Sequence, residues 1–356
     1  MTTIKYILYT FICSAMLILC GCSSDHTENE TLNEKILKDA KALQLDTVEL
    51  NGIDLSRSQQ FYVYQDSILI VNNYSRDGNS LIELYELKSK VLLNRLLKIG
   101  RGRNEVLQCN TFVSDNKIII YDFQLQKLFK VDIDSAIANK NYIPPHVFIP
   151  DGGISRVAYL GNHTIVENLY VFDNDKLKIH QNGKRLLFSK DVEIENRKNY
   201  KFNTQNVAGS GLIISSPNKQ NVMYASGNYS FIEMYNNKLE LEKKICGPKQ
   251  LKQDYYIDEN NEVIFNRTIP YAYINYYCTE KEVGLLYYGA LVDVSDDEFE
   301  NHNAYLLVFD WEGNLKKNYA IGAHALTISN SVKYPNTYYC CIRGKDKELY
   351  LCKAHE

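Results

Sequence analysis

Residues 81–100 read LIELYELKSKVLLNRLLKIG, and this stretch decides the fold. An apolar strand ends near Tyr85, a polar turn follows, and a second strand rich in leucine runs to Gly100. The same order recurs in FIEMYNNKLELEKKICG at 231–247 and in YLLVFDWEGNLKKNYAIG at 305–322. A short supersecondary unit repeated along a chain is typical of propellers and other repeat architectures. The chain is therefore expected to be built from repeated β-hairpins.

Weaker copies of the hairpin occupy 127–149 and 176–189, and the C-terminal strands YYCCIR and ELYLCKA supply one more. The copies are spaced by roughly 45–75 residues, and four-stranded propeller blades recur at the lower end of this range. Helical periodicity is nearly absent beyond residue 45, whereas short runs of strand-forming residues continue to the C-terminus. The sequence predicts an all-β fold: a six-bladed β-propeller of four-stranded antiparallel blades over 45–356. We expect Asp46–Leu50 to pair with the C-terminal blade and close the ring, which leaves only short edges.

The loop after the first hairpin carries a family resemblance. Ile99-Gly100-Arg101-Gly102-Arg103-Asn104-Glu105-Val106 precedes a strand, and SDNKIIIYDFQLQKLFKVDI follows at 114–133. This resembles the Gly-x-Gly-x-x-Glu loop and the blade pattern of NHL-like six-bladed propellers, and most of all the lipoprotein branch of TolB-like propellers. The usual Gly-Pro-Gly-Glu of the family is Gly-Arg-Asn-Glu here, and the motifs cover one and a half blades. The resemblance implies the fold but adds little about function, because most such lipoproteins have no assigned activity.

The two glycines of this loop also fit part of a nucleotide-binding fingerprint. A dinucleotide loop needs a third glycine and a following helix, whereas Glu105 and a strand follow here. We expect Gly100 and Gly102 to turn the chain from the outer strand of one blade to the inner strand of the next. Glu105 is expected to cap backbone amides of the same loop.

The N-terminal sequence predicts where in the cell the protein is located. Ile7 to Leu19 is almost wholly apolar, which suits a signal peptide and is short for a membrane-spanning helix. Leu19-Cys20-Gly21-Cys22 resembles the lipobox of bacterial lipoproteins, although an apolar helix that merely contains cysteines is the alternative. We expect residues 1–21 to be a signal peptide, Cys22 to carry the lipid, and 22–44 to be a tether. The protein is then held at the cell envelope, at the outer membrane on its periplasmic side or at the cell surface.

Composition excludes several classes of function. The net charge of −3 supplies no basic field for nucleic acid. No Cys-x-x-Cys pair is present, so a redox motif or a zinc knuckle is not supported. Six cysteines follow Cys22. Cys109, Cys246 and Cys278 are expected to be small buried apolar residues, and Cys340 or Cys341 is a candidate to bridge Cys352 across a terminal hairpin.

Catalytic and metal motifs are missing as well. The histidines are scattered, and the acidic run at 293–300 lacks the spacing of an EF-hand loop. Gly209-Ser210-Gly211 falls short of a nucleophile elbow. We therefore expect no catalytic residue, no metal and no cofactor.

Two groups of residues are candidates for binding a partner. The first is the pair Arg101 and Arg103, because guanidinium groups offer planar, bidentate donors. The second is a tyrosine cluster, Tyr271, Tyr273, Tyr276 and Tyr277, beside Arg267, which would stack a sugar or hold a peptide. The alternative is that the tyrosines simply fill and cover a strand.

Three short motifs resemble an O-glycosylation sequence of some gram-negative envelope proteins, Asp-Ser/Thr followed by an aliphatic or small residue. They place candidate sites at Thr47, Ser67 and Ser135.

We expect a monomeric, lipid-anchored propeller that binds an envelope protein, a peptide or a glycan, or acts as a scaffold for it. The alternative is a lyase or hydrolase with its active site on the propeller axis.

Overall fold

The computed structural model describes most of the chain after its N-terminus. The described residues are 27–55, 58–73, 80–107, 109–114, 116–122, 124–148, 154–160, 164–169, 175–181, 184–190, 211–251, 255–257, 263–265, 268–293, 302–345 and 347–356. Cys22 and Arg267 lie outside them, as do the leader and the acidic run after residue 293.

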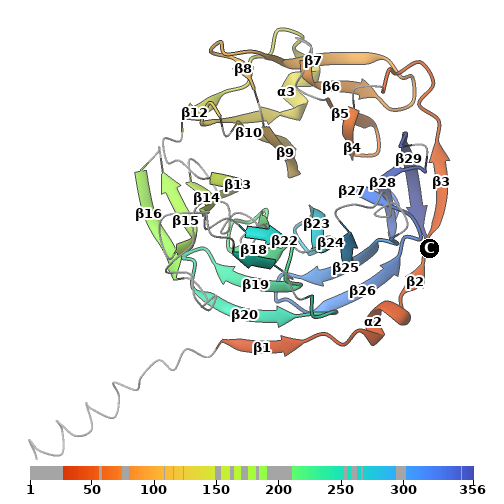
Figure 1. Ribbon diagram of the computed structural model, residues 1–356. Coiled ribbons are helices and arrows are strands. Elements are labelled where there is room, and N and C mark those ends of the chain that lie inside the picture. Colours follow the sequence, from red (N-terminus) through yellow and green to blue (C-terminus); the bar gives the residue numbers. More distant parts are fainter. Residues whose placement is uncertain are drawn as a thin grey trace, which may run out of the picture.

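The described strands form four- and five-stranded sheets that succeed one another around a ring (Figure 1). The first three sheets along the chain consist of β4 Ser58–Tyr64, β5 Ile68–Asn73, β6 Ser80–Glu86, β7 Leu92–Ile99 and β8 Glu105–Val106; of β9 Cys109–Ser114, β10 Lys117–Asp122, β11 Lys127–Asp132 and β12 His146–Phe148; and of β13 Ile154–Leu160, β14 Thr164–Leu169, β15 Asp175–Gln181 and β16 Lys184–Lys190.

The later sheets also take strands from the N-terminal segment. They consist of β17 Gly211–Ser215, β18 Asn221–Ser226, β19 Phe231–Asn236 and β20 Leu241–Cys246 with β1 Glu28–Thr31; of β23 Thr268–Cys278, β24 Glu282–Asp293, β25 Tyr305–Asp310 and β26 Leu315–Ala320 with β2 Lys41–Ala42; and of β27 Ala325–Asn330, β28 Thr337–Arg343 and β29 Leu349–His355 with β3 Gln44–Val48. A two-stranded ribbon, β21 Tyr255–Ile257 and β22 Val263–Phe265, and two short helices, α2 Lys35–Lys38 and α3 Ile133–Ala138, complete the described elements.

The first strand of each sheet lies nearest the axis. β4 contacts β27, β27 contacts β23, β23 contacts β17, and β17 contacts β13. β9 also contacts β23, although their sheets are far apart in sequence. The all-β propeller predicted from the hairpin repeats is confirmed, because successive antiparallel sheets stand around one axis (Figure 1).

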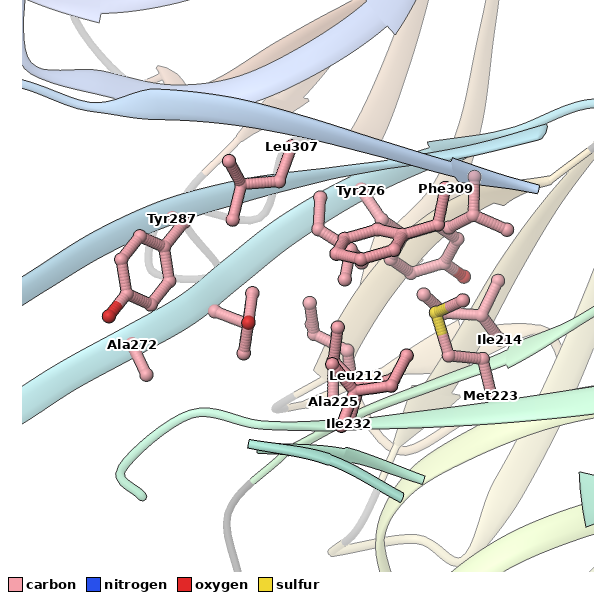
Figure 2. Close-up of a cluster of buried hydrophobic side chains, with 14 of the residues drawn as sticks. Leu212, Ile214, Met223, Ala225, Ile232, Ala272, Tyr276, Tyr287, Leu307 and Phe309 are labelled. Atoms are coloured by element: carbon pink, nitrogen blue, oxygen red, sulfur yellow. The ribbon is translucent and has the colours of Figure 1, made fainter. Parts of the chain in front are cut away.

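The hydrophobic core lies between neighbouring sheets. One cluster fills the space between the β17 sheet and the β23 sheet, where Leu212, Met223 and Ile232 face Leu307 and Phe309 (Figure 2). Similar clusters join the β23 sheet to the β27 sheet and the β27 sheet to the β4 sheet. A middle strand such as β5 is therefore buried on both faces, which explains its apolar run Ile68–Val71.

The ring is closed by the pairing of β3 with β29. The register is antiparallel, with Val48 opposite Leu351 and Asp46 opposite Lys353. The sequence predicted this pairing for Asp46–Leu50, and the paired residues are 44–48.

The segment before β3 differs from the tether predicted for residues 22–44. In Figure 1 it follows the perimeter of the ring, with β1 outside β20 and β2 outside β26. Leu32 and Leu37 are buried in the cluster between the β17 and β23 sheets. The predicted domain boundary at residue 45 is therefore too late. Leu32 and Leu37 belong to the propeller core although the sequence around them is mostly polar.

Gly247 makes room for this N-terminal segment. Its φ of +103° lies in the left-handed region, and a Cβ there would stand 2.5 Å from the carbonyl oxygen of Leu32. The amide of Leu32 in turn donates to the carbonyl of Cys246 at 2.8 Å. A residue other than glycine would push the segment off the sheet edge.

Candidate functional site

A cavity of about 270 Å³ opens at one end of the axis. It is formed where the inner strands β4, β23 and β27 end, together with residues of the β9 sheet. Its lining residues are Tyr62, Val63, Tyr64, Gln65, Val113, Asn116, Tyr276, Tyr277, Cys278, Thr279, Ile328, Ser329, Asn330 and Val332. Four sheets thus contribute to one site, which we call the axial cavity.

The lining of the axial cavity is uncharged. Its polar groups are phenol and alcohol hydroxyls and side-chain amides, without a Lys, Arg, His, Asp or Glu among the residues just named. The hydroxyl of Tyr277 donates to Glu282 at 2.8 Å, and burial raises the pKa of this phenol well above its ordinary value. The cavity therefore offers neutral hydrogen-bonding groups on an apolar wall, which is the usual make-up of a ligand site.

A buried amide holds the inner strands together beside the cavity. Asn275 on β23 accepts from the backbone N–H of Ile328 at 3.2 Å and donates to the hydroxyl of Tyr62 at 3.4 Å. Ser329 on β27 accepts from the N–H of Val63 on β4 at 3.2 Å. These bonds join inner strands of three sheets, so they hold the strands together beside the cavity.

The predicted tyrosine cluster is not an exposed face, and this prediction is corrected. Tyr273 is 1% exposed; its hydroxyl donates to the carbonyl of Gly247 at 2.8 Å and its ring lies 4.9 Å from that of Tyr287. Tyr276 and Tyr277 are also buried, and Tyr271 packs against the core cluster of the β23 and β27 sheets. The physical reason is that β23 is an inner strand covered on both sides by neighbouring sheets.

Two of the four tyrosines, Tyr276 and Tyr277, nevertheless line the axial cavity. Sequence reasoning missed the other lining residues, such as Gln65, Thr279 and Ser329. Each follows or ends a strand in a different sheet, so local sequence shows no sign that they meet.

The Arg101–Glu105 loop lies at the outer edge of the β4 sheet, between β7 and β8. The Glu105 carboxylate accepts from the backbone N–H of Gly102 at 2.6 Å, which is the capping contact expected from the sequence. A Cβ on Gly100 or Gly102 would meet that carboxylate at 2.2 or 2.8 Å. A side chain at either glycine would therefore displace the Glu105 carboxylate from its hydrogen bond to Gly102.

Arg101 and Arg103 are exposed on this loop, far around the ring from β23. The structure thus separates the two groups that the sequence proposed as binding residues. Arg103 lines a second hollow of about 400 Å³, between β7 and the residues just before β12.

The three candidate glycosylation residues are placed differently. Thr47 on β3 and Ser135 in α3 are exposed, and Ser67 between β4 and β5 is half-buried. The backbone N–H of Ser135 donates to the Asp132 carboxylate, which caps α3. Thr47 and Ser135 are therefore surface residues of the propeller.

The described cysteines are free thiols, and Cys340 lies directly opposite Cys352 on β28 and β29. Burial raises the pKa of Cys341 to about 12, so this thiol is a poor nucleophile. Among the described residues no group of three or more His, Cys, Asp or Glu side chains is arranged to hold a metal ion. In the same part of the chain, no helix has the length and apolar character to span a bilayer.

Comparison with known proteins supports the architecture. The family described as TolB-like 6-blade propeller-like matches residues 60–331. A putative exported protein from Bacteroides fragilis superposes with a TM-score of 0.51 at 11% identity, over 92% of this chain and 98% of that protein. A DUF4221 family member from Bacteroides vulgatus also gives 0.51, at 9% identity, over 88% of this chain and 96% of that protein. No curated protein matches the sequence.

Proposed function

Because this chain belongs to the TolB-like 6-blade propeller-like family, we propose that it is an envelope propeller that binds a partner or acts as a scaffold for one. Fold alone does not decide function, since one propeller architecture hosts many activities. The proposal is carried by the axial cavity, an uncharged site at the convergence of four sheets.

The chemistry of the cavity indicates what the partner presents. Hydroxyl and amide groups donate and accept hydrogen bonds without a charge, so they suit a peptide main chain or the hydroxyls of a glycan. At about 270 Å³ the cavity is slightly smaller than most ligand sites, which span roughly 300–1,000 Å³. It is sized for one end or one unit of a larger molecule.

The blade count belongs to the same proposal. In the described part of the chain six sheets contain four or more strands, and the matching family is described as six-bladed. We assign one blade to each of these sheets, with the last blade completed by β3.

The cellular location is proposed from the N-terminal sequence and from the fold shared with the putative exported protein of Bacteroides fragilis. Cys22 after the lipobox-like run would carry the lipid, and the protein would be held at the outer membrane. An exported protein with the same fold supports an envelope location in general. A monomer is the simplest state for a closed ring of this kind.

The enzymatic alternative, a lyase or hydrolase on the axis, would need acid, base or metal-binding groups converging there. The axial cavity presents hydroxyls and amides at that position, which favours binding.

A photo-crosslinking residue at Val332 tests the proposal in the membrane-bound protein. Val332 lines the axial cavity and is 64% exposed, so the probe would reach a bound partner. We expect a discrete covalent product, identified by mass spectrometry, that is lost when Asn330→Trp fills the cavity mouth. The same probe at Val91, which is 56% exposed on the turn before β7, serves as the matched control. Identical products from both positions would sink the assignment of the cavity.

A further inference from the structure

The sheets differ in whether an additional strand pairs with their outermost strand. β8 adds to β7, β1 adds to β20 and β2 adds to β26, each as a short parallel strand on the outside. In the described part of the chain β12 pairs with β11 alone. An edge strand presents unpaired backbone N–H and C=O groups and is a template for another strand.

The β12 edge is unusually apolar for a surface. Ile143, Val147 and Phe148 are 64%, 41% and 59% exposed. They lie within six consecutive residues, whereas comparable side chains elsewhere are mostly buried in the core. Exposed apolar side chains gathered at one place mark an interaction surface more often than singly scattered ones do.

Cations flank this edge. The hollow beside it is lined by Lys98 and Arg103 on one wall and by Ile143 and Pro144 on the other. The Lys127 ammonium donates to the carbonyl of Gly102 at 2.6 Å and so holds the arginine loop against the β9 sheet. Burial, Lys127 and Arg103 lower the pKa of His146 on β12, which is consistent with a positive field at the strand.

The molecule itself shows what completes such an edge. β1, with the sequence Glu-Asn-Glu-Thr, lies in parallel register on β20. The ammonium of Lys243, only 7% exposed, is 2.7 Å from Glu30 and 3.8 Å from Glu28. A short acidic strand held by backbone pairing and by lysine is therefore a stable fifth strand in this fold.

We propose that the free edge of β12, with Lys98 and Arg103 beside it and Arg101 exposed on the same loop as Arg103, binds an extended acidic segment of a partner protein by strand addition. Main-chain hydrogen bonds supply affinity in this mode, and side-chain pockets and charges supply specificity. The inference rests on the proposal that the propeller is a binding module, but it uses a different site from the axial cavity.

The test uses a fluorescent peptide with the sequence Thr-Glu-Asn-Glu-Thr-Leu-Asn-Glu, that of residues 27–34, and the mature protein. We expect saturable binding by fluorescence anisotropy that weakens as salt rises. The double variant Arg101→Glu/Arg103→Glu should weaken binding by roughly tenfold or more, about 1.4 kcal/mol. Lys345→Glu/Lys347→Glu, an exposed pair of lysines at the same spacing on another sheet, is the matched control and should bind normally.

Two further measurements separate strand addition from simple charge attraction. A peptide N-methylated at alternate residues lacks the pairing donors and should bind much more weakly than the parent. Phe148→Asp should abolish binding, while Val91→Asp should not, and melting curves for both should match the parent protein. Absence of saturable binding, full binding by the N-methylated peptide, or equal affinity of the arginine and lysine doubles would each overturn the proposal. Because crosslinking at Val332 reports on the axial cavity, failure of the β12 edge leaves that proposal separately testable.

Discussion

Glu105 shows how one carboxylate shapes a loop. It caps Gly102 while Lys127 binds the carbonyls on the other side of the same turn. Glu105→Ala should destabilise the propeller by about 1 kcal/mol, because a charge-assisted hydrogen bond to the backbone is lost in a partly exposed place. Thermal melting measures this, with Glu86→Ala on β6 as the control. An unchanged melting temperature for Glu105→Ala would contradict the role.

His324 should make stability depend on pH. It is 2% exposed against the ring of Tyr288, and burial, Arg343 and His302 lower its pKa to about 4. The histidine pKa of the unfolded chain is near 6.5. Between pH 6.5 and about 4, His324 is therefore protonated in the unfolded chain and neutral in the folded protein. Stability is full above pH 6.5 and falls as pH drops towards 4, by on the order of 2–3 kcal/mol.

Urea unfolding at several pH values checks this, because His324→Phe should flatten the profile between pH 6.5 and 4. A parallel decline in both proteins would assign the acid sensitivity to other groups.

Tyr273 shows where residue patterns mislead. Alternating tyrosines suit a half-buried surface as well as a buried strand, and only the neighbouring sheets decide between them. Tyr273→Ala should lower stability by about 3–5 kcal/mol, as loss of a large buried aromatic does. Tyr273→Phe, which loses only the bond to Gly247, should cost about 1 kcal/mol. Equal melting temperatures for the parent and Tyr273→Ala would show that the side chain is not packed.

At the scale of elements, the N-terminal segment acts as a belt around the outside of the ring. Leu32 and Leu37 enter the core, the amide of Leu43 donates to Ala320, and Lys41 pairs with Glu356. Burial of each leucine contributes roughly 1.5–3 kcal/mol. Removing residues 23–40 should therefore destabilise the whole propeller by several kcal/mol, as removing β3 should.

Calorimetry of the two truncations measures this. Gly247→Ala is a milder variant, since its Cβ would displace Leu32 without shortening the chain. If removal of residues 23–40 left melting unchanged, the belt would contribute nothing to stability.

The hairpins could be predicted because their signals are local: a strand, a turn and a second strand within about 20 residues. The belt could not. Its partners, Cys246 and Ala320, are more than 200 residues away, and its own sequence contains too few apolar residues to reveal a packed face. The axial cavity was hidden for the same reason, since Tyr62, Thr279 and Ser329 meet only when the ring is assembled.

For the whole molecule, the proposed anchor makes a direct prediction. Cys22→Ala should abolish lipid attachment and slow removal of the leader, whereas Cys20→Ala should not, because small Gly21 precedes Cys22 at the cleavage position and bulky Leu19 precedes Cys20. Mass spectrometry of the membrane fraction distinguishes the two variants. Lipid on the Cys22→Ala protein would refute the assignment.

The pairing of β3 with β29 has a consequence for biogenesis. In the proposed export of the chain, residues 44–48 would emerge early but have no partner until residues 351–355 follow them. Contacts between the two ends of a chain carry the largest loop-closure cost and form late. The ring of an exported chain would therefore stay open, with unpaired strand edges, until the C-terminal strand has crossed the membrane. Such intermediates are prone to aggregate, so we expect the proposed export to depend on periplasmic holdase chaperones.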